Sequence, residues 1–225
     1  MLTDKLKIND DKTEFMIIGT RQQLSKISPC HLTIGNTVVA PVATARNLGS
    51  WMDTSLTLQE HINKTCRAAY FHIHNIRHIR KFLTKKATET LVHAFVIGRI
   101  DYCNSLLYGL PAVHVDKLQR LQNSAARLIT HTPRFHHITP VLKSLHWLPV
   151  KFRILFKIAI LRFKVLHGRS PYYLKELVTL KDNSRYNFRS HNGLLLETPR
   201  IKSKKALGDR SFSMAASTRH MEQAT

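Results

Sequence analysis

Asp10 and Asp11 are the one adjacent carboxylate pair in the sequence. Paired carboxylates hold two metal ions in phosphoryl-transfer sites, where the ions stabilise the attacking and leaving oxygens. Such a pair belongs at the tip of an apolar hairpin, whereas Asn9 and Lys12 give this one a polar setting. We therefore expect a solvated turn here rather than a metal site.

The other residues that could carry out chemistry lack the neighbouring groups that such chemistry needs. His74 and His78 are four apart, which is half of a zinc site, but no Glu lies between them and no third ligand is apparent. Cys103 has no His close by in sequence, so we expect a buried, inert thiol. Trp147 lies between two leucines and is expected in the core rather than stacked on a base. No G-x-S-x-G or Walker-type loop is present.

Positive charge is the strongest physical signal. The formal net charge is +21, and all of it lies after residue 60, because residues 1–60 hold six basic and six acidic side chains. The like charges of such a positive segment repel one another unless a polyanion neutralises them. Nucleic acid is the leading candidate partner and an acidic membrane surface the second. A merely solubilising basic surface is the third interpretation.

Hydrophobic periodicity places these charges on helices. Residues 56–83 put Ile62, Ala69, Ile73 and Ile76 on one face, with a basic stripe on the other. Residues 113–128 bury Leu118, Leu121, Ala125 and Leu128 and expose a second stripe. The nucleic-acid-binding residues expected on these faces and at the joint after the first helix are Lys64, Arg67, His74, His78, Lys81, Lys85, Lys117, Arg120 and Arg127.

Further helices are predicted over 86–106, 151–166 and 172–180. The second long helix should bury Leu91, Phe95, Ile97, Ile100 and Leu106. Asp53 and Ser55 offer N-caps before the first helix, and Gly109-Leu110-Pro111 ends the second.

The N-terminal part is predicted to be a small β unit. A strand is expected at 15–18, a hairpin at 31–34 and 37–40 around Gly35-Asn36, and a short strand at 45–49. The fold class is therefore α+β, mostly α: a β unit over 1–55, a helical region over 56–180, and a basic, partly disordered tail over 181–225.

Composition bounds the remaining possibilities. No apolar run reaches 18 residues, so no membrane span is expected, and the polar first residues do not read as a secretory signal. Three cysteines lie far apart, which indicates a reducing compartment. We expect an intracellular protein of the cytoplasm or nucleus.

Several segments together carry a resemblance to a known family. The chain resembles, to about Ala216, the end of a LINE-type reverse transcriptase, the jockey-like open reading frame of non-LTR retrotransposons. The matching segments are 11–15 (DKTEF), 45–49 (ARNLG) with Asp53, His61-Ile62, 100–111 (IDYCNSLLYGLP), 118–127 (LQRLQNSAAR), 137–150 (HITPVLKSLHWLPV) and 208–212 (GDRSF).

The resemblance implies roles for particular residues. Lys12 resembles the lysine of the polymerase motif after the catalytic Asp pair, where it can act as general acid toward pyrophosphate. Leu48-Gly49 resembles the primer-grip turn, where Gly lets a backbone approach a nucleic-acid strand. Residues 1–55 would be the end of the palm, and the helices from Leu56 would be the thumb that clasps the RNA–DNA or DNA duplex of template and primer.

Departures from the family pattern limit what the resemblance implies. The aromatic-x-Asp-Asp hairpin that binds Mg²⁺ in the full-length enzyme lies before the Lys-Thr-Glu stretch, so we expect this chain to carry no cofactor and not to polymerise alone. Residues 217–225 do not continue the family's Trp-containing stretch, which suggests a truncation or frame change. The alternatives are a non-catalytic helical protein-interaction module or an unexpressed transposon relic.

Overall fold

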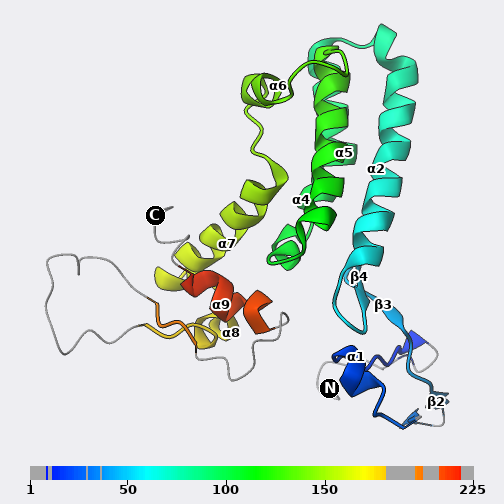
Figure 1. The fold of residues 1–225 in the computed structure, drawn as a ribbon, viewed down its shortest axis with the longest axis vertical. Helices are drawn as coiled ribbons and strands as arrows, with labels where there is room; N and C mark the ends of the chain where they lie inside the picture. Colours follow the sequence, from blue (N-terminus) through cyan, green and yellow to red (C-terminus); the bar gives the residue numbers. More distant parts are fainter. Residues whose placement is uncertain are drawn as a thin grey trace, which may run out of the picture. The chain divides into compact units, whose positions relative to one another are not determined.

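The structure is a computed structural model that describes residues 9, 12–28, 30–35, 37–180, 196–199 and 208–218. It divides into two compact units, Met1–Lys64 and Thr65–Thr225, and the boundary lies inside helix α2. Helices dominate, and the strands belong to the N-terminal unit (Figure 1). The expected class, α+β and mostly α, is confirmed. Within the described residues no helix has the length and apolarity needed to cross a membrane.

The N-terminal unit holds two antiparallel hairpins. β1 (Leu32–Ile34) pairs with β2 (Thr37–Val39), which confirms the first predicted hairpin. β3 (Thr44–Asn47) pairs with β4 (Ser50–Asp53), which the sequence analysis missed. The strand predicted at 15–18 is wrong, because only Phe15 forms a bridge there, to Pro41. A short helix, α1 (Arg21–Leu24), follows and is capped by the Thr20 side chain.

The first long helix begins later than predicted. α2 spans Gln59–Ile79 and continues as η2 (Arg80–Phe82). Asp53 is not its N-cap but accepts hydrogen bonds from the backbone N–H groups of Thr57 and Leu58 in the preceding turn. Burial alone would raise the pKa of Asp53, but these hydrogen bonds outweigh it and the pKa is lowered. The predicted inward residues Ile62, Ala69, Ile73 and Ile76 are all buried.

The second predicted helix is interrupted. α3 (Lys85–Val92), capped by Thr84, runs into a π-turn, η3 (His93–Ile97), and then α4 (Gly98–Asp101) and η4 (Asn104–Leu107). The π-turn carries an extra residue, so both Val96 and Ile97 face the core and Phe95 is 44% exposed. The prediction that Phe95 and Leu106 are buried is therefore wrong.

The remaining helices complete the C-terminal unit. α5 buries the four apolar residues predicted for it, and Trp147 is buried as expected. The last helix, α9, falls where loops were predicted, whereas 181–195, 200–207 and 219–225 of that tail lie outside the described residues. The bounds are α5 Ala112–Thr130, α6 Thr139–Ser144, α7 Val150–Leu166, α8 Tyr172–Glu176, η5 Gly208–Arg210 and α9 Phe212–Ser217.

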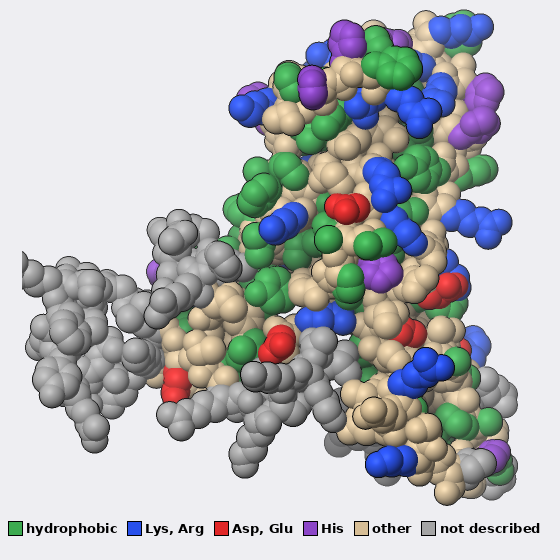
Figure 2. Space-filling model, in the orientation of Figure 1, with side chains coloured by type: hydrophobic (Ala, Val, Ile, Leu, Met, Phe, Trp, Pro, Cys, Tyr) green, Lys and Arg blue, Asp and Glu red, His purple; other side chains and the backbone are tan. Residues whose placement is uncertain are grey.

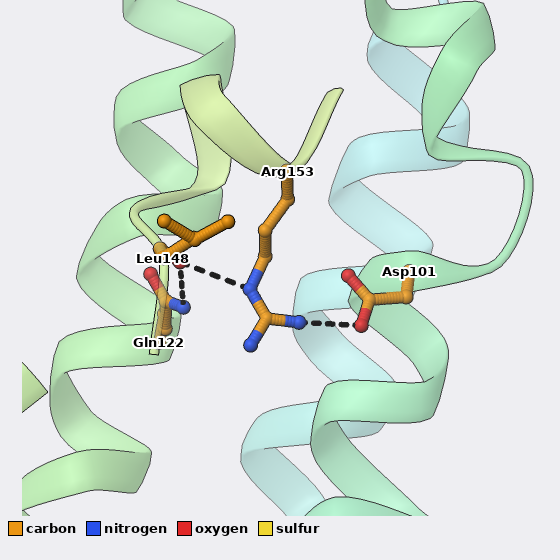
Figure 3. Close-up of polar contacts among 4 residues, drawn as sticks. All are labelled: Asp101, Gln122, Leu148 and Arg153. Atoms are coloured by element: carbon orange, nitrogen blue, oxygen red, sulfur yellow. Dashed lines mark hydrogen bonds and ion pairs between the residues drawn. The ribbon is translucent and has the colours of Figure 1, made fainter. Parts of the chain in front are cut away.

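A polar network joins α4, α5 and α7 (Figure 3). The Leu148 carbonyl accepts from the Nε2 of Gln122, which is fully buried, at 2.8 Å, and from the Nε of Arg153 at 2.9 Å. Arg153 also pairs with Asp101. Gln119 accepts the backbone N–H of Val150 at 2.9 Å and so satisfies the first turn of α7. The Leu148 carbonyl and the Val150 N–H are satisfied here by side chains from α5, whereas the Oδ1 of Asp101 is buried without a hydrogen-bond partner.

A second long-range contact joins η5 to the turn after η4. Arg210 donates to the carbonyl oxygens of Tyr108 and Leu106 at 3.2 and 3.3 Å. Gly109 has φ +70°, and a Cβ there would lie 2.7 Å from the Arg210 side chain. A residue with a side chain would be strained here by the positive φ and would have to displace the Arg210 side chain, so glycine is favoured at this position.

Arg153→Met should lower the free energy of unfolding by about 2 kcal/mol, because it leaves the half-buried Asp101 carboxylate without its cation. Adding Asp101→Asn should recover part of this loss, because the uncompensated charge is removed. Urea titrations followed by circular dichroism measure both. Lys157→Met, at an exposed position of the same helix, is the control and should change stability by less than about 0.5 kcal/mol. Equal effects at the two positions would contradict a structural role for the pair.

Candidate nucleic-acid interface

Arg80 connects the ends of α2 and α5. Its side chain is buried, with 9% exposure, and donates from Nε to the Leu128 carbonyl at 3.2 Å and from Nη2 to the Ile129 carbonyl at 3.1 Å. Its Nη1 donates to the Leu83 carbonyl at 2.8 Å. The last carbonyls of a helix have no partner within the helix, so a cation at this point satisfies them and opposes the negative end of the helix dipole.

A groove lies beside this contact, between the C-terminal halves of α2 and α5. Its volume is about 910 Å³. The residues that line it are Tyr70, Arg77, Arg80, Lys81, Arg120, Asn123, Ser124, Arg127, Leu128, His131, Thr132 and Arg134. All of them belong to the C-terminal unit.

The groove is strongly basic. Five arginines and one lysine line it, and none of the described residues in its lining is acidic. Figure 2 shows Lys, Arg and His side chains gathered over the upper ends of α2 and α5. Guanidinium groups stay charged throughout the physiological pH range and donate in a planar fork that matches phosphate oxygens. The arrangement can therefore bind phosphates.

Three of the residues predicted from sequence meet in this groove: Lys81, Arg120 and Arg127. Lys81 also lies over the Phe82 ring, with its Nζ 4.9 Å from the centroid. Arg127 donates to the His136 carbonyl at 3.1 Å, which fixes the loop after α5. The structure brings these three together across two helices, although the sequence placed them on separate stripes.

Other predicted cations on the helices lie outside the groove lining. Lys64 pairs with Glu60 at 3.3 Å and lies 3.1 Å above the Trp51 ring, so its charge is partly neutralised. Arg67 and Lys85 are exposed. Lys117 is half-buried on α5, and its charge acts on Cys66. Burial raises the pKa of the Cys66 thiol and Lys117 opposes this only in part, so the thiol stays protonated.

His74 and His78 contact one another on the exposed face of α2. Their Nε2 atoms are 2.9 Å apart, so one ring donates to the other. The described residues contain no group of three or more His, Cys, Asp or Glu side chains arranged to hold a metal ion. The ring that accepts at Nε2 carries its own proton on Nδ1, so that Nδ1–H remains as a donor while the two rings stay in contact.

The remaining predicted residues belong to the N-terminal unit. Lys12 is exposed in the turn before Phe15, and Asp10 and Asp11 lie outside the described residues. Leu48 and Gly49 form the loop between β3 and β4, with φ values of +46° and +86°. Two consecutive positive φ values are typical of a tight two-residue hairpin turn. Leu48 is 84% exposed at its tip.

Among the tyrosine, lysine and arginine residues of the groove, sequence reasoning missed Tyr70, Arg77, Arg80 and Arg134. Tyr70 and Arg77 are seven residues apart, and Arg77 and Lys81 are four apart. A helical wheel that included all three would therefore have placed them on one face of the first helix. Arg80 carries no such signal, because its partners lie 48 and 49 residues away. Arg134 follows Pro133, which cannot continue a helix, so it lies outside the helical pattern that predicted the basic stripes.

The chain was compared with family models, curated proteins and solved structures, and none of them matches it.

Arg80→Met should destabilise the protein by about 2 kcal/mol or more, since it leaves buried carbonyl oxygens without donors. Arg77→Met removes the same charge from an exposed position and should cost less than about 0.5 kcal/mol. Thermal unfolding followed by circular dichroism distinguishes them. Equal stability of the two variants would show that the Arg80 contacts contribute little.

Proposed function

We propose that this chain is part of a LINE-type reverse transcriptase. In this proposal the C-terminal unit (Thr65–Thr225), called the helical unit below, binds the backbone of a template–primer duplex. The N-terminal unit would be the end of the palm, and α2 to α5 would be the thumb. The observation that carries the proposal is the groove between α2 and α5, where six cationic side chains converge without an acidic neighbour among the described residues.

Charge of this kind suits a nucleic-acid backbone. Each phosphate that a cation contacts releases a counterion, so binding is favourable and depends steeply on salt. The exposed cations Arg67 and Lys85 extend the positive surface beyond the groove. Such contacts position a duplex and do not read its sequence.

Four of the segments that carry the resemblance contact one another in the C-terminal unit. Segments 100–111, 118–127 and 137–150 are among those that carry the resemblance. Gln122 of segment 118–127 accepts a hydrogen bond from Gln119 and donates one to the Leu148 carbonyl of segment 137–150. The turn at Gly109 contacts Arg210 of the 208–212 segment. Two pairs of these segments that are far apart in sequence are thus in direct contact.

Polymerisation is not proposed for this chain alone. In the family the Mg²⁺-binding carboxylates precede the stretch that Lys12 resembles, so Lys12 and the Leu48-Gly49 turn would act only beside a catalytic sheet. Within the chain, the described residues supply cations and hydrogen-bond donors, which bind and orient a duplex.

A protein-interaction module is the second candidate, and α7 favours it. Phe152, Phe156 and Phe163 share the face of α7 opposite its core, and they are 54%, 57% and 43% exposed. An exposed row of large apolar side chains marks an interaction surface. This surface would bind a partner protein while the charge only maintained solubility.

The triple variant Arg77→Gln, Arg120→Gln and Arg134→Gln should weaken binding to an RNA–DNA hybrid duplex at least tenfold and reduce the salt slope by about 2 to 3. Fluorescence anisotropy over a series of salt concentrations measures both. Lys151→Gln, Lys157→Gln and Lys164→Gln on α7 remove the same charge and form the control. If the two triple variants lose affinity equally, net charge rather than the groove is responsible.

Primer extension on the purified chain with Mg²⁺ and nucleotides should give no incorporation, whereas duplex binding should be retained. The physical reason is that the family's metal-binding carboxylates lie in a segment that the chain does not resemble. Extension of the primer above the level of a heat-denatured sample would overturn the proposed division between binding and catalysis.

A further inference from the structure

The turn after α5 carries a large aromatic side chain that is almost fully exposed. Phe135 is 95% exposed, the most exposed of the large hydrophobic side chains among the described residues. In such a position a phenylalanine gains none of the free energy that burial of its ring would contribute. Single exposed apolar residues are ordinary on protein surfaces, so the exposure acquires meaning only from what surrounds it.

The surroundings of Phe135 are basic and well defined. His131 and Thr132 before it and Arg134 beside it line the groove. The backbone N–H of His136 donates to the Pro133 carbonyl at 3.2 Å, which closes a turn with Arg134 and Phe135 at its tip. Arg127, itself a groove residue, holds this turn through the His136 carbonyl. Phe135 is therefore placed at the tip of a turn that Arg127 holds, next in the chain to the groove residue Arg134.

The chemistry of this combination points to one kind of ligand. Phosphates match the groove cations, and an aromatic face beside them matches the face of a nucleobase. In a duplex each base is stacked between its neighbours, so its face is not accessible to a side chain. A base in an unpaired strand exposes its face, and stacking on an aromatic ring is then available to any of the bases.

We propose that the turn 133–136 forms a subsite for an unpaired nucleotide strand that continues from the bound duplex. The groove cations hold the phosphates of the strand, and Phe135 stacks on a base where the strand leaves the groove past Arg134. This subsite rests on the proposed function, because it requires that the groove binds nucleic acid.

The decisive experiment compares two probes: a blunt RNA–DNA hybrid duplex, and the same duplex with a short single-stranded extension. The full chain, Phe135→Ala and the control Phe156→Ala are titrated with each by fluorescence anisotropy. Phe156 is an exposed phenylalanine on α7, outside the groove lining. The extension should strengthen binding of the full chain and of Phe156→Ala about tenfold, and this gain should vanish in Phe135→Ala. Binding of the blunt duplex should be equal for all three.

A direct readout of stacking comes from Phe135→Trp and Phe156→Trp. The extended duplex should quench the added fluorescence of F135W and leave that of F156W unchanged. Equal gain from the extension in Phe135→Ala and in the full chain, or quenching in F156W instead, overturns the subsite while duplex binding still stands. Absence of binding to both probes by the full chain overturns the proposed function and the subsite together.

Discussion

The buried guanidinium of Arg80 is the contact on which the basic end of the helical unit depends. It donates to carbonyls at the end of α5 and just beyond the end of α2, and so it fixes how close the two helices come. The width of the groove follows from that spacing. Arg77, Lys81 and Arg120 can act together because a residue that mostly faces inward holds their helices in place.

A second set of interactions maintains the fold through residues that are mostly different from those that line the groove. The segments that resemble a family meet through Gln122, Leu148 and Gly109, where they satisfy buried polar groups or permit close packing. Their distinctive residue types are therefore explained by the fold. The cations of the groove come from α2 and from the loop after α5 as well as from one of those segments. The proposed family membership and the proposed ligand binding thus rest on largely different residues.

The parts of the fold that sequence predicted are those with a regular period. The inward faces of α2 and α5 repeat every 3.6 residues, and a turn at Gly35 joins two alternating segments. The π-turn at His93–Ile97 changes the helical period locally. β4 was missed, and only part of its partner β3 was predicted. For the site, Lys81, Arg120 and Arg127 were predicted as phosphate ligands, but their convergence depends on tertiary contacts that a helical wheel does not contain.

Two helices that end side by side place their partial negative charges together. α2 and α5 both finish at the groove, so about half an elementary charge from each lies beneath its cations. The cations of the groove thus serve as internal counterions for the fold before any ligand arrives. A bound polyanion shares them with the helix ends, so its affinity is lower than their number alone would give. A neutral residue in place of Arg80 would remove the counterion that contacts a helix end directly and so would cost folding stability, whereas the exposed Arg77 could be replaced at little cost.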